Sequence, residues 1–417
     1  MKYWNWVLNR IMRQLWWQAG LYALLGLVTA LAATGAERWV SINLPFEVSR
    51  EAVDSLLNII ASSMLAVTTF SLGAMTSAFG AATSNVTPRA TKLLMEDRVT
   101  HNVLSSFIGA FLFSIVGIIV LKTGSYGETG RAVLFVITIG VIGLVVFQLL
   151  RWINHLISLG RVGSTLDQLE AVTDAALKQR QQSPWLGCQL WPEDTTPPKG
   201  ARAICADSIG HVQFINVEAL SALCEAHGLT AWIAINTGNF IYRGTPVLWI
   251  KGEGSEPHED LDAKLVEQFV IAAARSFEQD PRFGLMVLAE VASRALSPAT
   301  NDPGTALDVI GRLTRLLSDW SDGREDVPVE YPRLHLRPLS QDDLFEDAFM
   351  LIARDGAGLV EIQLRLQKSL NALQALGSPE FRTAARHQAQ MALRRGLKAL
   401  SDEQDIERLK QAAACGQ

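Results

Sequence analysis

The hydrophobic and polar positions divide the 417-residue chain into two parts of different character. In the first part, long apolar runs contain no charged side chain, and each run can cross the roughly 30 Å apolar core of a bilayer as a helix. Four such runs predict transmembrane helices over residues 15–36, 56–79, 103–121 and 132–150. We therefore expect residues 1–160 to form a four-helix transmembrane domain.

Shorter patterns follow, and they are typical of a water-soluble fold. Small apolar residues and glycine turns predict strands over residues 202–206, 208–216 and 230–235, with a helix over residues 217–227. The segment 236–248 is similar to a turn of small barrel-sandwich domains such as lipoyl-type modules. Its hairpin has no lysine for a lipoyl or biotinyl group, so we expect a structural β-barrel-like element without a cofactor.

The rest of the second part is predicted to be mainly helical. Residues 179–202 are rich in Gln, Ser and Pro and indicate an exposed linker, whereas residues 260–320 have helical patterns. Beyond the helix-breaking segment 322–338, two amphipathic helices are expected, the second over residues 379–410. The first has an apolar seam formed by Leu359, Ile362, Leu366, Leu370 and Leu373. This seam either packs within its own domain or binds another subunit.

These patterns give the expected fold class and domains. We predict an integral membrane α-helical domain followed by an α+β cytoplasmic domain with a small β-barrel-like element and C-terminal helices. The soluble part is expected to divide into a β-rich barrel-like domain at residues 161–258 and a helical domain at residues 259–417.

Charge narrows the class of protein further. The net charge is −5, so the basic surface of a nucleic-acid-binding protein is not indicated and no nucleic-acid partner is expected. Residues 1–160 carry 11 basic and 7 acidic side chains. The basic ones are in modest excess before the first span, between the second and third, and after the fourth. By the positive-inside rule, both termini are predicted in the cytoplasm of a bacterial inner membrane.

The second predicted span is unusually rich in small and hydroxyl side chains. Ser62, Thr69, Gly73 and Thr76 share one face at helical spacing. Such a face suits either a water-filled path, which these four residues would line, or close helix packing without a pore.

Basic residues follow the second span. Arg89, Lys92 and Arg98 suit the inner mouth of a pore or the headgroups of anionic lipids. The alternative is that they serve only as the positive-inside signal.

The most distinctive motif lies at residues 275–306. Gln279-Asp280-Pro281 and Asn301-Asp302-Pro303 resemble helix starts, in which an Asn or Asp caps the helix and proline occupies its first turn. Arg294 could pair with Asp280 or Asp302 and join the two turns. The alternative is a ligand or ion site built from a set of polar side chains. That set is Gln279, Asp280, Arg294, Asn301 and Asp302.

These residues resemble the bacterial membrane-protein family known as domain of unknown function 2254. The shared patterns are "QD-x-x-FG" at 279–284 and "R-A-L-S-P-x-x-N-D-P-x-T-A" at 294–306, with "T-F-S-L" at 69–72. Ser84, Pro88 and Arg89 also match, and the resemblance covers most of residues 10–320. It implies a membrane protein but no particular activity.

No catalytic or metal-binding pattern is present in the sequence, so we expect neither an enzyme nor a cofactor or metal. The four cysteines lie far apart and are expected to be reduced and mostly packed. The favoured function is an oligomeric inner-membrane channel or channel-like permeation protein with a cytoplasmic vestibule or gating domain. Its expected partners are the lipid bilayer, other copies of the chain, and an ion or small solute. The alternative is a membrane-anchored sensor or scaffold whose soluble domain binds a small ligand or a partner protein.

Overall fold

The computed structural model describes residues 15–35, 49–95, 97–123, 128–158, 160–192, 194–253, 255–321 and 327–414. The chain divides into two compact units. The first contains the described residues up to Ser84 together with Thr91–Ser164. The second contains Asn85–Ala90 and Thr165–Gln417. A short segment directly after the second predicted span therefore belongs to the second unit.

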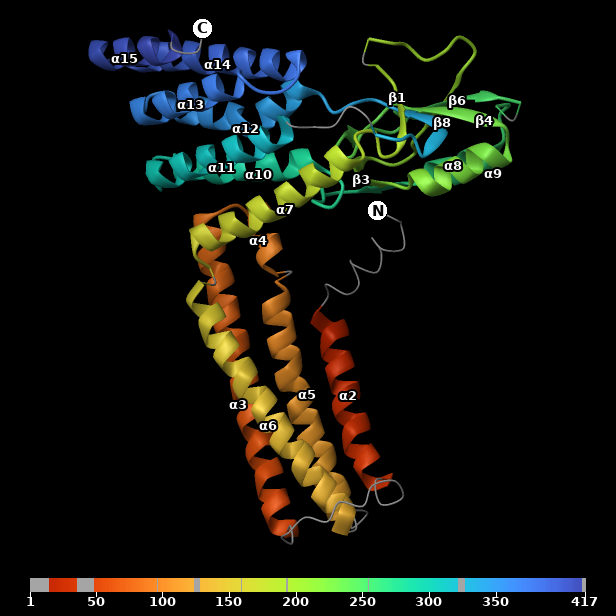
Figure 1. The fold of residues 1–417 in the computed structure, drawn as a ribbon, viewed down its shortest axis with the longest axis vertical. Coiled ribbons are helices and arrows are strands. Elements are labelled where there is room, and N and C mark those ends of the chain that lie inside the picture. Colours follow the sequence, from red (N-terminus) through yellow and green to blue (C-terminus); the bar gives the residue numbers. More distant parts are fainter. Residues whose placement is uncertain are drawn as a thin grey trace. The chain divides into compact units, whose positions relative to one another are not determined.

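The described part of the first unit consists of long helices and one short helix, α4 (Figure 1). They are α2 (Leu15–Gly35), α3 (Arg50–Asn85), α4 (Pro88–Met95, which contributes residues to both units), α5 (Arg98–Lys122) and α6 (Glu128–Ser158). Among the described residues, three segments are long and apolar enough to cross a membrane, namely Arg50–Ala81, Val99–Lys122 and Thr129–Ser158. The first predicted span corresponds to α2, where the segment that qualifies as apolar is shorter, Gly20–Thr29. Three of the four predicted spans therefore coincide with helices that are long and apolar enough to cross a membrane.

Apolar side chains explain how these helices pack. One buried cluster joins α3, α5 and α6 through Leu57, Phe113 and Leu134, and a second joins them through Met64, Phe107 and Trp152. On α2, a Cβ atom added to Gly26 would lie 2.8 Å from the carbonyl oxygen of Gly109 on α5. Glycine at both positions lets α2 and α5 approach closely, as small residues do in membrane helix pairs.

The main part of the second unit begins within α7 (Val162–Gln182, its first residues in the first unit), and its described strands form two sheets. The five-stranded sheet has the order β1 (Cys188–Leu190), β8 (Tyr331–Leu336), β4 (Leu229–Ile233), β6 (Pro246–Gly252) and β2 (Arg202–Cys205). β8 is parallel to both neighbours, and the other pairs are antiparallel. The three-stranded antiparallel sheet has the order β5 (Phe240–Ile241), β3 (Gly210–Ile215) and β7 (Phe269–Ala272). Helices α8 (Val217–Ala226) and α9 (Glu259–Val266) accompany the sheets.

The predicted β-barrel-like element is not confirmed, because each sheet is open and ends in two edge strands. The local strands and the helix at 217–226 are close to prediction. Their pairing is not, because β8 comes from far along the chain and inserts between β1 and β4. The five-stranded sheet therefore uses residues from both predicted soluble domains, and the division at 258 does not coincide with a boundary between compact units.

The remaining elements of the second unit, downstream of the sheets in the chain, are mainly helices (Figure 1). They are α10 (Pro281–Ala295), α11 (Pro303–Ser321), α12 (Gln341–Asp355), α13 (Val360–Leu373), α14 (Pro379–Ala399) and α15 (Glu403–Ala414). The predicted helix over 379–410 is two helices, and α12 was not predicted. Ile362, Leu366 and Leu370 of the apolar seam are fully buried. The seam therefore packs within its own unit, which was one of the two alternatives.

Candidate functional site

Asp280 is the centre of a buried polar cluster at the start of α10. It is the N-cap of this helix, and its Oδ1 accepts a hydrogen bond from the Phe283 amide at 3.2 Å. The Arg275 guanidinium donates to both carboxylate oxygens, from Nε to Oδ2 at 2.8 Å and from Nη2 to Oδ1 at 3.0 Å. The Asp280 side chain is 1% exposed. The predicted cap is confirmed, and a buried ion pair holds it in place.

Two effects oppose each other at this carboxylate. Burial raises the pKa of Asp280 above its ordinary value, and the Arg275 guanidinium and the Phe283 amide offset part of that rise. Arg275 also lies over the Phe283 ring, 5.3 Å from its centroid. The Arg275 side chain is therefore held by both charge and aromatic contact.

The neighbouring residues connect this cluster to the sheets. Gln279 Oε1 accepts a hydrogen bond from the Ile215 amide at 2.9 Å, and the Gln279 carbonyl accepts one from Thr237 Oγ1 at 2.7 Å. Gly238 has φ +88°, and a Cβ atom added there would lie 2.3 Å from Asp280 Oδ2. The loop after β4 thus packs directly against the carboxylate, and only glycine leaves room for it.

The glycine that ends the first half of the motif has a packing role. A Cβ atom added to Gly284 would lie 2.1 Å from Thr173 Oγ1, so α10 and α7 are in close contact at this point. Phe283 packs against Phe277, with ring centroids 4.4 Å apart. Gln279, Asp280, Phe283 and Gly284 therefore each make contacts that position α10.

The second half of the motif lies at the other end of α10. This helix has 15 residues and is about 22 Å long at 1.5 Å per residue. Asp302 is exposed and accepts a hydrogen bond from the Thr305 amide at 3.1 Å, as expected for a cap of α11. Asn301 is exposed with φ +47°. The structure thus brings Gln279 and Asp280 together but does not bring Asn301 or Asp302 to them.

The expected pairing of Arg294 with either aspartate is wrong. Arg294 lies in the last turn of α10, whereas Asp280 precedes the first turn and pairs with Arg275 instead. Asp302 caps α11 and bonds to Thr305. The two halves of the motif lie at opposite ends of α10, and no ion pair among the described residues joins them.

Sequence reasoning missed Arg180, because it lies in the segment predicted as an exposed linker. In the structure α7 extends to Gln182, and Arg180 is only 3% exposed. Its Nη2 donates to Asn236 Oδ1 at 2.6 Å, whereas Nε and Nη1 have no hydrogen-bond partner among the described residues. Burial lowers the pKa of the Arg180 guanidinium to about 10, so it remains charged at neutral pH.

A hollow of about 630 Å³ adjoins Arg180 within the second unit. It lies where α7 and α11 end and where α12 and α14 begin. Its lining includes Arg180, Gln181, Trp185, Trp320, Ser378 and Phe381. Gln181 Nε2 donates to the Asp319 carbonyl at 2.7 Å, and Trp320 Nε1 donates to Gln341 Oε1 at 3.0 Å. The hollow therefore has ordered walls, with one buried cation and several aromatic rings.

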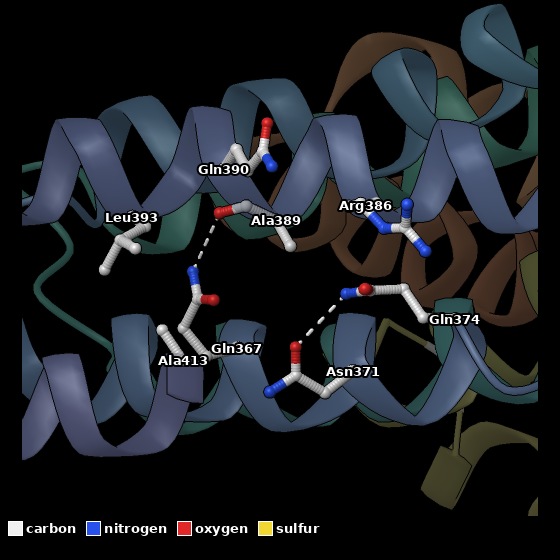
Figure 2. A pocket seen from close by; sticks show the side chains of 8 residues that line it. All are labelled: Gln367, Asn371, Gln374, Arg386, Ala389, Gln390, Leu393 and Ala413. Carbon is white, nitrogen blue, oxygen red and sulfur yellow. Dashed lines mark hydrogen bonds between the residues drawn. The ribbon is translucent and has the colours of Figure 1, made fainter. Parts of the chain in front are cut away.

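A second hollow, of about 340 Å³, lies between α13, α14 and α15, and four of its eight lining residues have amide side chains (Figure 2). Gln367 Nε2 donates to the Ala389 carbonyl at 3.0 Å, and Gln374 Nε2 donates to Asn371 Oδ1 at 3.2 Å. Asn371 Nδ2 donates to the Ala412 carbonyl at 2.9 Å. These bonds join the three helices, and the hollow is a polar packing seam.

The predicted pore-lining residues lie on one exposed face of α3. Ser62, Thr69, Gly73 and Thr76 are all exposed within the single chain. At about 100° per residue they lie opposite the face that packs on α5 and α6. The hydroxyls of Ser62, Thr69 and Thr76 donate to backbone carbonyls one turn earlier in α3, at 2.8 to 2.9 Å. The face carries three hydroxyl side chains and a glycine, and described parts of this chain do not cover it.

Of the three predicted basic residues, one has a defined partner. Arg89 donates to Glu290 of α10, and both residues belong to the second unit. This ion pair ties the turn that directly follows α3 to α10. The side chains of Lys92 and Arg98 lie outside the described residues.

The first unit contains polar groups that the sequence analysis did not single out. His155 Nε2 lies 2.7 Å from Asp97 Oδ2. Burial would raise the pKa of Asp97, but hydrogen bonds from His155 and Thr100 outweigh it and lower the pKa to about 2. Buried polar atoms without a hydrogen-bond partner among the described residues occur in Ser71, His101, Ser105, Gln148 and Trp152. Such groups commonly hold ordered water inside proteins.

No group of three His, Cys, Asp or Glu side chains suited to a metal ion occurs in the described part of the chain. Cys188 and Cys224 are buried and Cys205 is exposed, whereas Cys415 lies outside the described residues. Burial raises the pKa of both Cys188 and Cys224 to about 12, which keeps these thiols protonated and unreactive.

The three described cysteines should differ in reactivity. We expect a maleimide at neutral pH to modify Cys205 in the folded protein and to leave Cys188 and Cys224 unmodified until the protein is denatured. Mass spectrometry of peptides from the full chain measures each site separately. Rapid labelling of Cys188 before denaturation would contradict the described burial of this side chain.

Comparison with known proteins gives a family and no activity. The family described as "Predicted membrane protein (DUF2254)" matches residues 12–372. The uncharacterized proteins Mb1321c of Mycobacterium bovis and Rv1290c of Mycobacterium tuberculosis are each 26% identical over 253 residues. These alignments cover 57% of this chain and 46% of each relative, so the chain spans about half the length of the curated relatives it matches. No solved structure matches the chain.

The family match extends from the apolar helices through the Gln279–Gly284 and Arg294–Ala306 segments to α13. It therefore includes both the candidate membrane spans and the motif around Asp280. The chain belongs to the predicted membrane protein family DUF2254.

Proposed function

We propose that this membrane protein is a homo-oligomeric channel of the bacterial inner membrane and not an enzyme. In this proposal α2, α3, α5 and α6 all cross the membrane, so that both termini lie in the cytoplasm. The second unit then forms a cytoplasmic vestibule or gate. The observation that carries the proposal is the exposed polar face of α3, which lies opposite its own packing face.

The composition of this face distinguishes it from the lipid-facing surfaces of the same unit. Phe70 and Leu72, on the flanks of the α3 face, are 70% and 48% exposed, and Phe147 of α6 is 62% exposed. Large apolar side chains of this kind suit contact with lipid tails. Between the flanks, Thr69 and Gly73 offer lipid little apolar area. Several copies of the chain could instead turn this stripe toward a common axis, where water covers it.

The chemistry of the stripe indicates what could pass along it. Each Ser or Thr hydroxyl donates its hydrogen within α3. Both lone pairs of the oxygen then remain available to accept hydrogen bonds. Rings of such oxygens replace part of the hydration shell of a cation or align water, as carbonyl rings do in selectivity filters. We infer that the path carries small cations or small polar solutes.

The Arg89–Glu290 ion pair supplies a connection for gating. It joins the residues that follow α3 to α10, which is anchored by Asp280 at its first turn. A displacement of α10 would therefore move the end of the proposed lining helix. Arg89 is 57% exposed and Glu290 is 17% exposed, so the pair is open to solvent on the arginine side and is weakened by salt.

Single-channel recording in planar bilayers tests the pore assignment. We expect the Thr69→Leu/Thr76→Leu variant to lose conductance by roughly tenfold, because apolar side chains dewet a narrow path. The Phe70→Leu variant is the matched control, since Phe70 lies on the apolar flank, and its currents should equal those of the wild type. The mass of the particle in detergent gives the subunit number.

Two outcomes would refute the channel. One is unchanged current in the Thr69→Leu/Thr76→Leu variant. The other is a protein that gives no discrete current under steps of voltage, tension or pH.

A second candidate function is a membrane-anchored sensor or scaffold. It is favoured by one observation, the hollow of about 630 Å³ with its buried arginine in the second unit. In that case the α3 face serves helix packing. The two candidates are compatible if a ligand in the hollow controls the channel.

A further inference from the structure

We propose that the hollow beside Arg180 binds a small organic anion, with a carboxylate or phosphate head directed to Arg180 and a flat apolar body against the tryptophans. The inference concerns the second unit alone and does not depend on whether α3 lines a pore. It gives the sensor candidate a chemical class of ligand.

The first argument is a charge balance. Arg180 and Arg275 are 3% and 12% exposed, and one buried carboxylate, Asp280, lies among the described residues close to both. Asp280 is fully engaged by Arg275 and by the cap of α10. Arg180 therefore carries a buried charge whose direct partner is the neutral amide of Asn236. A buried charge without an opposite charge in contact is costly, and a bound anion would remove that cost.

The second argument is the number of unused donors. A guanidinium has five N–H groups, and buried arginines normally use most of them. Arg180 makes its bond to Asn236 through Nη2, and its Nε and Nη1 have no hydrogen-bond partner in the described part of the chain. Cys188 is near Arg180, but its thiol is protonated and cannot balance the charge. The vacant hydrogen-bonding capacity matches a carboxylate or phosphate.

The third argument is the shape and lining of the hollow. Its volume of about 630 Å³ is in the range of sites for metabolite-sized molecules. Trp185 and Trp320 are half-buried and supply ring surfaces, and Phe381 is buried beside them. Ser378 caps α14, so the N-terminus of this 21-residue helix also faces the hollow and favours negative charge. At the C-terminal end of α11, the carbonyls of Asp319 and Trp320 already accept hydrogen bonds from Gln181.

Isothermal titration calorimetry of the purified full chain in detergent tests the proposal. The probes are phenyl phosphate, benzoate and the neutral benzyl alcohol, with inorganic phosphate as a head group alone. We expect at least one of the two aromatic anions to bind more than about tenfold more tightly than benzyl alcohol, because a charge-assisted bond to Arg180 is made only by the anion. The tighter anion identifies the head group. Equal affinity for the anions and benzyl alcohol would overturn the proposal.

Variants identify the residue responsible. Arg180→Met should weaken binding of the anion by about tenfold or more, whereas Lys178→Met should leave it unchanged. Lys178 is the matched control, an exposed cation on the same helix that pairs with Asp174. Unchanged affinity in a folded Arg180→Met protein would refute the site.

A second variant decides the matter if Arg180→Met does not fold. Trp320→Leu keeps the charge and removes one ring. The variant should weaken the binding of phenyl phosphate or benzoate and leave the affinity for inorganic phosphate unchanged. If this variant binds the aromatic anion as tightly as the wild type does, the anion binds elsewhere on the protein and the proposed site is wrong.

Discussion

Replacing Gly238 with alanine should be among the most destabilising single substitutions in the second unit. The new Cβ atom would lie 2.3 Å from Asp280 Oδ2 and 2.8 Å from Arg275 Nη2, so it cannot be accommodated without separating the buried ion pair. The backbone at φ +88° also disfavours any side chain. We expect a loss of about 4 kcal/mol in the free energy of unfolding, combining backbone strain with disruption of the buried charges.

Gly200 provides the matched control. Its φ is +80°, and an added Cβ atom would meet no atom within 4 Å. Gly200→Ala should therefore show the backbone cost alone, about 1 kcal/mol. Denaturant or thermal unfolding of both variants, followed by circular dichroism, gives the comparison. Similar losses for the two variants would mean that the loop after β4 does not press against Asp280.

Removing the Asp280 carboxylate should have an effect of similar size. Asp280→Ala leaves Arg275 buried without its partner and removes the cap of α10. Breaking a buried ion pair and losing a cap together should cost about 4 kcal/mol of unfolding free energy. The same variant removes a negative charge that interacts with Arg180, which adds to the cost.

The motif itself supplies the control for this prediction. Asp302 also caps a helix but is exposed and has no arginine partner in the described residues. Asp302→Ala should cost about 1 kcal/mol, the typical value of a cap. The Arg275→Ala/Asp280→Ala variant should lose less than the sum of its single variants, since neither charge remains unpaired. Additive losses would show that the two side chains do not act as a pair.

Local features of the fold could be predicted from the sequence because short-range patterns determine them. The apolar runs located α3, α5 and α6, and the caps at Asp280 and Asp302 located the starts of α10 and α11. Small apolar residues and glycine turns located β2, β3 and β4 to within a few residues. Each of these depends on residues that are neighbours in the chain.

Features that depend on distant residues could not be predicted in the same way. Nothing in residues 331–336 alone indicates that β8 pairs in parallel with both β1 and β4. The polar composition around Arg180 suggested a linker. The groups that interact with the buried Arg180 side chain, the Asp280 carboxylate and the Asn236 amide, lie far along the chain and are not visible in the local pattern. For the same reason, the sequence identified Gln279 and Asp280 as part of one cluster but suggested Arg294, not Arg275, as the partner of Asp280.

The hydroxyl bonds within α3 have a mechanical consequence. Side chains that donate to the carbonyl one turn earlier compete with the amide that normally uses it, and they make a helix easier to bend. In α3 such bonds come from Ser62, Thr68, Thr69, Thr76 and Thr83. They are spread over much of a 36-residue helix that also contains Gly73 and Gly80. We therefore expect α3 to bend gradually along its length rather than at a single hinge.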